Sequence, residues 1–141
     1  MRRTQAPGPL RVMVYSDDRT VRRTVITALG TRPDPQLPEL EFLEVATGPV
    51  VLRSADAGRL DLLILDGEAT PAGGLGIARQ LKDEIHRCPP VLVITGRPQD
   101  AWLATWSRAD AVVAHPIEPG GLAEAVSGLL RARTTAVTVR P

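Results

Sequence analysis

Short apolar runs separated by longer amphipathic stretches make up most of this sequence. The apolar runs cover residues 12–15, 42–45, 62–65, 91–94 and 111–114. Each run is short, almost continuous and bounded by polar or turn-forming residues, which is the pattern of strands buried on both faces of a parallel sheet. The clearest is Leu62-Leu63-Ile64-Leu65, which stands between two aspartates.

The stretches between these runs have the spacing of helices with one apolar face. They are predicted to extend from Val21 to Gly30, from Thr47 to Gly58, from Leu75 to Ile85, from Pro98 to Trp106, and from Pro119 to about Arg131. Thr47 is a typical N-cap residue, and Pro119 suits the first position of a helix. Gly30 and Gly58 suit helix ends. Strands therefore alternate with helices along the chain.

This alternation predicts an α/β fold, a doubly wound parallel sheet of five strands with helices on both faces. Right-handed crossovers restrict the topology, and we expect the strand order 2-1-3-4-5. The folded domain is predicted to cover residues 10–131, after a lead-in at 1–9 that contains proline and glycine. Residues 132–141 are predicted to be a tail, which alternates like an edge strand but which we expect to be disordered.

Composition narrows the classes of function. The chain has 141 residues, which suits one domain, and its net charge of +1 and aromatic content of 3% argue against nucleic-acid binding. No apolar run approaches the ~20 residues of a membrane span, and Met1-Arg2-Arg3 is not followed by the apolar region of a signal peptide. Cys88 is the single cysteine, which excludes a disulfide within the chain. We expect a soluble cytoplasmic protein without membrane insertion.

Polar side chains follow four of the predicted strands. In chain order they are Ser16-Asp17-Asp18, Asp66, Thr95-Gly96 and His115-Pro116. In a doubly wound sheet, ligands bind beyond the carboxyl ends of the strands, at the switch between the first and third strands. Carboxylates, a hydroxyl and an imidazole at this edge are suited to holding a phosphoryl group and a metal ion. The alternative is that these residues only solvate loops and cap helices.

With these residues the sequence resembles the receiver domain of two-component response regulators, and most of all the atypical stand-alone receivers of actinobacteria. The motifs that carry the resemblance are Val12-Met13-Val14-Tyr15-Ser16-Asp17-Asp18, Asp61-Leu62-Leu63-Ile64-Leu65-Asp66, Val93-Ile94-Thr95-Gly96 and Ala114-His115-Pro116. The resemblance covers about residues 10–131. It implies the flavodoxin-like receiver fold, and a regulatory protein rather than an enzyme.

The resemblance also implies roles for individual residues. Asp66 takes the position of the phosphoacceptor, a carboxylate nucleophile that becomes an acyl phosphate. Asp17 takes the position of a direct Mg²⁺ ligand, with Asp66 and the backbone carbonyl of Glu68 as the other protein oxygens. Thr95 and Gly96 match the switch hydroxyl and the small residue that leaves room for the phosphoryl group.

Three further residues have positions that the family uses around the pocket. Glu68 and Arg97 stand where the family controls access of hydrolytic water, and an ion pair between them is one expected arrangement. The His115-Pro116 bond matches a peptide that is commonly cis in the family, and a cis bond would direct His115 towards the pocket. Because cis X-Pro bonds have a prior of only about 5%, this expectation rests on the resemblance.

Three positions depart from the family pattern. Ser16 stands where the first of two acids is usual, so the resemblance implies weakened Mg²⁺ binding. His115 replaces a lysine that contacts the phosphoryl group, and histidine is only partly charged near neutral pH. Val112 replaces the aromatic switch residue. These losses favour a pseudo-receiver that binds its partner without phosphorylation. A pH-responsive pocket, in which protonated His115 replaces the lysine, stays open, as does an imidazole without a role.

Output is expected to be a protein contact, because the ten residues after the last predicted helix are too few for an effector domain. The family usually makes this contact through its fourth helix, fifth strand and fifth helix, and a homodimer through that face is one expectation. Trp102 and Trp106 lie four positions apart on one helical face. Core packing is the default for such a pair, but at least one is a candidate interface anchor. A histidine kinase is a further expected partner.

Two other functions stay open. One is a phosphorylatable stand-alone receiver that accepts a phosphoryl group on Asp66 from a histidine kinase or a small donor. The other is a small phosphohydrolase, or a nucleotide- or flavin-binding domain, on the same sheet. Against this second class, the sequence has neither a G-x-G-x-x-G motif after the first strand nor a P-loop. Asp66-Gly67-Glu68 also lacks the second aspartate of haloacid-dehalogenase-type phosphatases.

Overall fold

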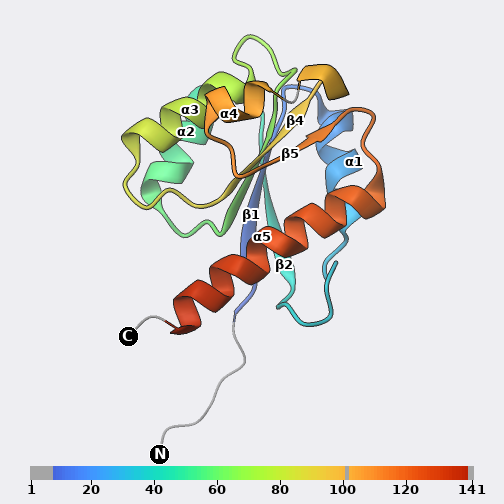
Figure 1. Cartoon of the computed structure of the whole chain (residues 1–141), viewed down its shortest axis with the longest axis vertical. Coiled ribbons are helices and arrows are strands. Elements are labelled where there is room, and N and C mark those ends of the chain that lie inside the picture. The colour runs from blue at the N-terminus through green and yellow to red at the C-terminus, as the bar shows by residue number, and fades with distance from the viewer. Residues whose placement is uncertain (1–7, 101, 140–141) are drawn as a thin grey trace, which may run out of the picture.

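The computed structural model describes residues 8–100 and 102–139, so residues 1–7 of the predicted lead-in and 140–141 of the predicted tail lie outside it. The strands are β1 (Leu10–Tyr15), β2 (Leu40–Val45), β3 (Leu62–Asp66), β4 (Val91–Thr95) and β5 (Ala111–Ala114). The helices are α1 (Arg19–Leu29), α2 (Gly48–Ala57), α3 (Gly74–Glu84), α4 (Leu103–Ser107) and α5 (Pro119–Val139), with a short 3-10 turn, η1, at Pro98–Asp100. The strands form a parallel sheet in the order β2-β1-β3-β4-β5, as predicted, with helices on both faces (Figure 1).

The register of the sheet brings the strand ends together at one edge. Asp66, at the end of β3, pairs with Ile94, one residue before Thr95. Thr95 in turn pairs with Ala114, one residue before His115. Because parallel strands present their carboxyl ends on the same side, the predicted site residues start from neighbouring positions.

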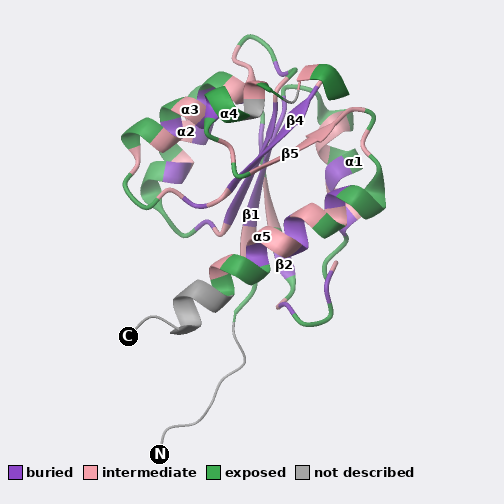
Figure 2. Cartoon of the chain, in the orientation of Figure 1, coloured by how far each residue is buried: buried purple, intermediate pink, exposed green. Residues whose placement is uncertain are grey.

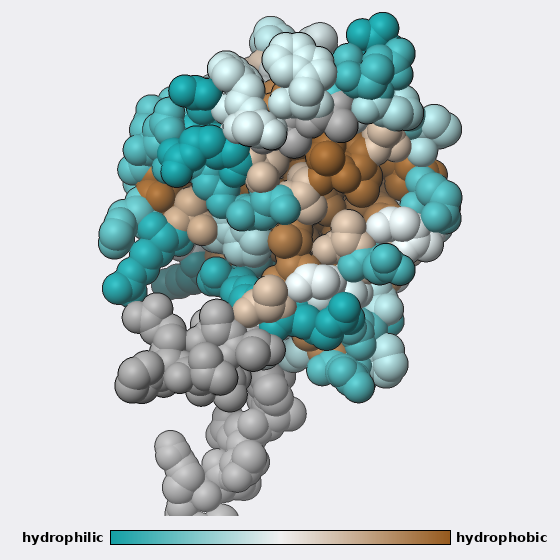
Figure 3. Space-filling model, in the orientation of Figure 1, coloured by the Kyte–Doolittle hydropathy of each residue, from teal (hydrophilic) through white to brown (hydrophobic). Residues whose placement is uncertain are grey.

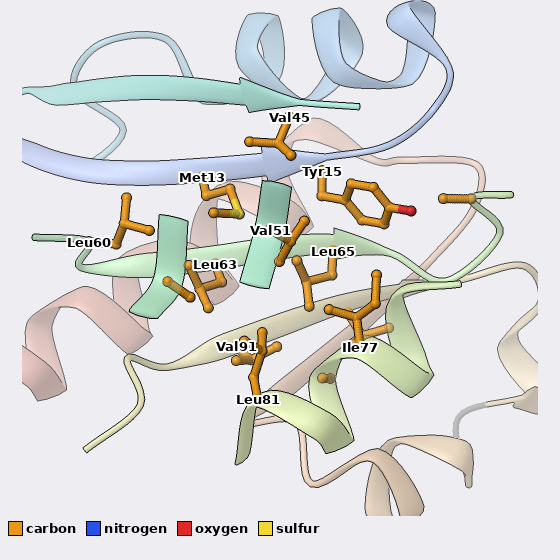
Figure 4. Packing of buried hydrophobic residues seen from close by; sticks show 14 residues of the cluster. Met13, Tyr15, Val45, Val51, Leu60, Leu63, Leu65, Ile77, Leu81 and Val91 are labelled. Carbon is orange, nitrogen blue, oxygen red and sulfur yellow. The ribbon is translucent and has the colours of Figure 1, made fainter. Parts of the chain in front are cut away.

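One face of the sheet is covered by α2 and α3 (Figure 4). Alternate strand residues point to this face, because successive side chains of a strand project to opposite sides. The buried members of this cluster are Met13, Tyr15, Val45, Val51, Ala55, Leu60, Leu63, Leu65, Ala69, Ile77, Ala78, Leu81, Val91 and Val93. Full burial of one large aliphatic side chain stabilises a fold by about 1.5–3 kcal/mol, so this layer holds α2 and α3 firmly on the sheet.

The opposite face of the sheet packs against α1 and α5. The buried members of this second cluster are Val12, Val14, Val25, Leu29, Leu37, Leu40, Leu62, Ile64, Leu92, Ile94, Leu122, Val126 and Leu130. Figure 2 shows the central strands buried and the outward sides of the helices exposed. Since β3 and β4 are covered on both faces, all their residues are buried, and their sequences are almost wholly apolar.

Most helix ends follow the signals in the sequence. Gly30 ends α1 with φ of 61° and Gly58 ends α2 with φ of 82°, a left-handed conformation that favours glycine. The Asp18 carboxylate caps α1 by accepting a hydrogen bond from the backbone N–H of Thr20. Thr47 takes the N-cap position of α2, as predicted, but its side chain makes no capping hydrogen bond.

The prediction of one helix from Pro98 to Trp106 is wrong. The chain instead forms η1 and then the short helix α4. The N–H of Asp100 donates to the carbonyl of Arg97, and the Arg97 guanidinium holds the Asp100 carboxylate at 3.1 Å across the same turn. This tight i to i+3 closure replaces the regular i to i+4 bonding that a continuous helix needs.

The last helix is longer than predicted. α5 continues to Val139, well past the expected end near Arg131, so the predicted tail is helical there. The Arg131 guanidinium pairs with the Asp34 carboxylate, and Arg133 pairs with Asp61 at 3.4 Å. These ion pairs fasten the later turns of α5 to the loops before β2 and β3. Within the part of the chain that the structure describes, no helix is long and apolar enough to cross a membrane.

Candidate functional site

The carboxylate of Asp66 is the central group at the carboxyl edge of the sheet. This residue is only 3% exposed. Its Oδ2 accepts a hydrogen bond of 2.8 Å from the Ser16 hydroxyl. Its Oδ1 accepts one of 2.9 Å from the backbone N–H of Glu68 and lies 3.3 Å from Nε2 of His115. Both oxygens at the predicted phosphoacceptor position therefore already have partners, which come from the ends of β1, β3 and β5.

Ser16 connects Asp66 to the segment that begins α1. The residue is fully buried, and its Oγ accepts a hydrogen bond of 3.0 Å from the backbone N–H of Asp18 while it donates to Asp66. The Ser16 carbonyl accepts a hydrogen bond of 2.7 Å from the Arg22 guanidinium. A hydroxyl has one proton to donate, and Ser16 donates it to Asp66. A neutral donor therefore stands where the resemblance expects an acid.

Asp17 is bound by the loop between β3 and α3. Its two carboxylate oxygens accept hydrogen bonds from the backbone N–H of Thr70, at 3.0 Å, and from the Thr70 hydroxyl, at 3.1 Å. The backbone hydrogen bond, with the hydroxyl bond behind it, lowers the pKa of Asp17. The Tyr15 hydroxyl donates to the Ala72 carbonyl of the same loop. The end of β1 thus holds this loop at two points.

The buried Tyr15 ring lies within electrostatic reach of both carboxylates. Burial raises the pKa of Tyr15, and the charges of Asp17 and Asp66 raise it further. Asp17 and Asp66 therefore both act on the phenol at the end of β1.

Thr95 and Gly96 end β4 beside the end of β3. Thr95 is 1% exposed, and its hydroxyl lies 3.2 Å from the carbonyl oxygen of Arg97 and 3.4 Å from that of Val113. Glu68 covers Gly96, because a Cβ placed on Gly96 would be 2.6 Å from the Glu68 carboxyl carbon. The room left by the missing side chain of Gly96 is therefore filled by Glu68.

The expected ion pair between Glu68 and Arg97 is wrong. Arg97 instead holds Asp100, with Nη2 3.1 Å from Oδ1 and Nε 3.2 Å from Oδ2. The hydrogen bonds and the charge of Asp100 raise the pKa of the Arg97 guanidinium, and the charge of Glu68 makes the smallest contribution. Asp100 is three residues away along the chain, so it is paired with little loss of chain entropy.

Two other predicted site residues, Val112 and His115, belong to β5 and the residue that follows it, and β5 is an edge strand of the sheet. Val112 is half-buried within the strand. The His115-Pro116 peptide is cis, as expected from the resemblance, and the His115 ring reaches Asp66. The Thr70-Pro71 peptide is also cis, which the sequence had not indicated.

Asp66 and Asp17 are the two carboxylates at this edge that could offer oxygens to a magnesium ion. Mg²⁺ takes oxygen ligands in a strict octahedral geometry and dehydrates reluctantly. Here Oδ2 of Asp66 is hydrogen-bonded to Ser16, and both oxygens of Asp17 are hydrogen-bonded to Thr70. Among the residues that the structure describes, no group of three or more His, Cys, Asp or Glu is arranged to hold a metal ion. Each of these carboxylate oxygens keeps a further lone pair, so Asp66 and Asp17 can offer oxygens to a metal ion while they keep these hydrogen bonds.

The candidate interface residues Trp102 and Trp106 are exposed by 68% and 47%, so the default of core packing is wrong. Arg79 of α3 lies over the Trp106 ring, 5.1 Å from its centroid, and donates a hydrogen bond of 2.8 Å to the Trp106 carbonyl. These contacts join α4 to α3. Figure 3 shows apolar atoms gathered near the centre of the adjacent face, over β5, whose residues are all half-buried.

Sequence reasoning missed the two residues that hold the β3–α3 loop, Tyr15 and Thr70. Tyr15 is 57 positions from Ala72, and Thr70 is 53 positions from Asp17. No local pattern marks such distant pairs. It also treated Ser16 only as a lost charge, whereas the structure shows its hydroxyl bound to the central carboxylate.

A doubly wound sheet of order 2-1-3-4-5, with a buried aspartate ending β3 and a buried threonine ending β4, is the arrangement that the resemblance to receiver domains implies. No protein-family model matches the chain. A Mycobacterium tuberculosis protein named "uncharacterized response regulatory protein", in strains CDC 1551 / Oshkosh and ATCC 25618 / H37Rv, is 60% identical over 123 residues. The match covers 87% of this chain and 92% of that protein. The chain therefore belongs to the response regulators of two-component signalling, as a receiver domain.

Solved structures agree on the fold. The receiver domain of a LuxO repressor protein from Vibrio parahaemolyticus superposes with a TM-score of 0.79 at 16% identity, covering 94% of this chain and 98% of that one. Response regulator TrrA from Thermotoga maritima, in a complex with Mg²⁺ and BeF, gives a TM-score of 0.70 at 24% identity, covering 86% and 99%. At these identities the likeness extends to the architecture alone.

Proposed function

We propose that this receiver domain is an atypical, stand-alone cytoplasmic signalling module, a pseudo-receiver that acts through protein contact, with phosphorylation of Asp66 weak or absent. The observation that carries the proposal is the bonding of Asp66. Its carboxylate is satisfied by the Ser16 hydroxyl, the Glu68 N–H and the His115 ring. In a conventional receiver a metal ion and a lysine would neutralise this region.

The charge requirement of phosphoryl transfer supports this reading. An attached phosphoryl group adds about −1.5 to −2 charge at neutral pH, and catalysis of its transfer depends on cations that stabilise that charge. His115 is the side chain beside Asp66 where the family has a lysine, and a lysine keeps its charge throughout the physiological range. The Arg22 guanidinium donates hydrogen bonds elsewhere, from Nη1 to the Ser16 carbonyl at 2.7 Å and from Nε to Oε1 of Glu44 at 3.0 Å.

The exposed tryptophans support an output through protein contact. Trp102 and Trp106 are large rings on one surface, which is the type of anchor that dominates binding energy at protein interfaces. Because Arg79 fixes Trp106 to α3, the proposed contact surface consists of α3 and α4 together with the neighbouring β5. A second copy of the chain and a histidine kinase are the partners that this proposal includes.

The second candidate is a receiver that is phosphorylated on Asp66. The presence of a buried aspartate beside Thr95 and Gly96 favours it. In that reaction an Asp66 oxygen forms a bond to phosphorus of a donor such as acetyl phosphate. The bond from phosphorus to the acetyl oxygen breaks, and acetate leaves with the electron pair.

Labelling with radioactive acetyl phosphate in the presence of Mg²⁺ tests the proposal. We expect the natural chain to label slowly, and the double variant Ser16→Asp/His115→Lys to label at least about tenfold faster, because it regains an acid and a fixed cation. Asp66→Asn, made in both backgrounds, identifies label on this residue. Rapid Asp66-dependent labelling of the natural chain would establish the second candidate instead.

Tryptophan fluorescence gives a binding test that does not depend on chemistry. Trp102 and Trp106 lie on and beside α4, so they report movement of that region. Titrating Mg²⁺ with and without beryllofluoride is expected to give no saturable change in the natural chain. A tight, saturable change that needs both components would contradict the proposal.

A further inference from the structure

A groove runs along α1 and ends at the first residue of α5, the helix that packs beside α1 (Figure 1). Its lining on α1 extends from Arg19 to Ala28, and Pro119 of α5 completes it. We call this cavity the α1 groove. Its volume is about 540 Å³, and sites for small molecules typically have about 300–1,000 Å³. The α1 groove therefore has the size of a site for a small organic ligand.

Two arginines that line the α1 groove are one helical turn apart. Arg19 and Arg23 have the spacing i, i+4, so their side chains lie on one face of α1, where like charges destabilise a helix. Within the described chain, Arg19 has no hydrogen-bond or ion-pair partner. Nη1 of Arg23 lies 3.7 Å from Oε2 of Glu44, whose Oε1 is bound by Arg22 at 3.0 Å. Most of the positive charge in the groove is thus left without a close counter-charge.

Two other cavities differ from the α1 groove in their charges. A cavity at the start of β2 is lined by Arg32 but also by Glu39 and Glu41. In a cavity after α3, the ammonium of Lys82 lies 2.6 Å from Oδ2 of Asp110. In the described chain, no aspartate or glutamate is among the residues that line the α1 groove. A cavity lined by one sign of charge attracts ligands of the opposite sign, so the α1 groove favours an anion.

Three threonines add hydroxyl and methyl groups to the α1 groove. Thr20, Thr24 and Thr27 lie on the same face of α1. The Thr24 hydroxyl donates to the Thr20 carbonyl at 2.8 Å, whereas the hydroxyls of Thr20 and Thr27 have no partner within the described chain. These two hydroxyls can therefore donate to a ligand oxygen. The threonine methyl groups, with Ala28 and Pro119, give the groove apolar walls.

This set of groups suits a phosphate ester better than a carboxylate. The planar guanidinium of arginine donates two parallel hydrogen bonds to a phosphate group. A phosphate monoester carries about −1.5 to −2 charge at neutral pH and has three acceptor oxygens, which match two arginines and a hydroxyl. A carboxylate has a single charge and two oxygens. The apolar walls then face the organic part of the ester.

We infer that the α1 groove binds a small organic phosphate, with its phosphate group between Arg19 and Arg23 and its organic part against the threonine methyl groups, Ala28 and Pro119. This inference goes beyond the proposed function, because it gives the receiver domain a small-molecule ligand whose binding does not involve Asp66. The ligand would contact both α1 and the start of α5, which pack on the same face of the sheet.

Isothermal titration calorimetry of the full chain, without metal ions, tests the inference. The probes are ADP, glucose 6-phosphate and inorganic phosphate. We expect at least one of the two esters to bind saturably and about tenfold more tightly than inorganic phosphate, which cannot use the apolar walls. Arg19→Gln/Arg23→Gln should weaken binding of that ester at least about tenfold. Thr27→Val, which replaces the hydroxyl by a methyl group, should weaken it about threefold.

The matched control is Arg53→Gln/Arg87→Gln, which removes the same charge from two exposed arginines, on α2 and after α3. Its affinity for the ester should equal that of the natural chain, and urea midpoints should show that all variants are folded.

Three results would overturn the inference. The first is no saturable binding of either ester to the natural chain. The second is an equal loss of affinity in the control and in Arg19→Gln/Arg23→Gln, which would show a general effect of charge. The third is binding of inorganic phosphate as tight as that of both esters, which would remove the role of the apolar walls. Labelling of Asp66 is measured separately, so these results leave the test of the proposed function unaffected.

Discussion

Aspartates at the amino ends of the strands (the amino edge) and at their carboxyl ends (the carboxyl edge) have different side-chain partners. At the amino edge, Asp34, Asp61 and Asp110 each accept one hydrogen bond from a backbone N–H, of 2.8, 2.8 and 2.7 Å, and each pairs with a side-chain cation, Arg131, Arg133 and Lys82 respectively. At the carboxyl edge, Asp66 and Asp17 also accept a backbone N–H. Each also accepts from a hydroxyl, of Ser16 and of Thr70 respectively, and Asp66 has the His115 ring as a third partner.

This difference separates carboxylates that are paired with fixed cations from carboxylates that are held mainly by neutral donors. Arginine and lysine keep their charge throughout the physiological range, so the amino edge is neutralised permanently. A hydroxyl satisfies a lone pair without neutralising the charge. At the carboxyl edge the nearest side-chain nitrogen to Asp66 is that of His115, at 3.3 Å, and not that of an arginine or lysine. The chain's single lysine, Lys82, is used at the amino edge, and a histidine stands where the resemblance expects one at the other.

The largest effect in this comparison is expected from Asp110→Ala at the amino edge. The change leaves the backbone N–H of Val91, a fully buried residue, and the Lys82 ammonium without their shared partner. Removing such a partner typically costs about 1–3 kcal/mol of the free energy of unfolding, which urea denaturation measures. Asp110→Asn keeps an acceptor for Val91 and should cost clearly less. Equal losses for the two variants would contradict the role given to the backbone bond.

A smaller effect is expected from Asp66→Asn at the carboxyl edge. The asparagine oxygen can still accept from Glu68, and its amide can donate to Ser16 Oγ. The Ser16 hydroxyl proton then loses its acceptor, which opposes the gain from removing a buried charge. We expect the free energy of unfolding to change by less than about 1 kcal/mol, with either sign. A loss as large as that of Asp110→Ala in the same urea experiment would mean that the two edges do not differ in their contribution to stability.

The smallest expected effect is a decrease in the free energy of unfolding that occurs only at acidic pH. The backbone N–H of Gln36, with Arg131 behind it, lowers the pKa of Asp34, and the backbone N–H of Thr70 lowers that of Asp17. A lowered pKa in the folded state contributes stability above the ordinary value of about 3.9 and loses it as the pH falls through the lowered one. Urea midpoints should therefore fall with acidification below about pH 4.

Three variants sharpen the acid prediction, two at the amino edge and one at the carboxyl edge. Asp34→Asn and Asp17→Asn should each flatten the acid decline of the urea midpoint, because each removes one of the two carboxylates that carry it. Arg131→Met should shift part of the decline to higher pH, because it removes one of the causes that lower the pKa of Asp34. If the urea midpoint depends on pH in the same way in all three variants as in the natural chain, the lowered pKa values of Asp34 and Asp17 do not cause the loss of stability in acid.

The fold could be predicted from the sequence because its information is local and repeated. The runs at β3 and β4 are apolar at almost every position, which only strands covered on both faces require. Alternation of strands and helices, together with the right-handed crossover, then leaves few topologies. The errors occurred where one contact decides the outcome. Arg97 and Asp100 replace the start of a helix by a tight turn, and Arg131 and Arg133 anchor α5 past its expected end.

The positions at the site could also be located from the sequence, but their bonding could not. Asp66, Thr95 and His115 can be selected as candidate site residues from the sequence, because each is a polar residue directly after an apolar run. Nothing in the sequence shows that the Glu68 carboxylate packs over Gly96 instead of pairing with Arg97. A long side chain has several rotamers of similar energy, and surrounding charges choose among them.

The sequence by itself thus determined the sheet, the order of its strands and the edge at which its polar residues meet, since periodicity and chain connectivity are properties of the linear pattern. Only the tertiary structure decided which partner each aspartate takes. Those partners lie as many as 97 positions apart, as for Arg131 and Asp34, and are selected by geometry after the sheet has brought them together.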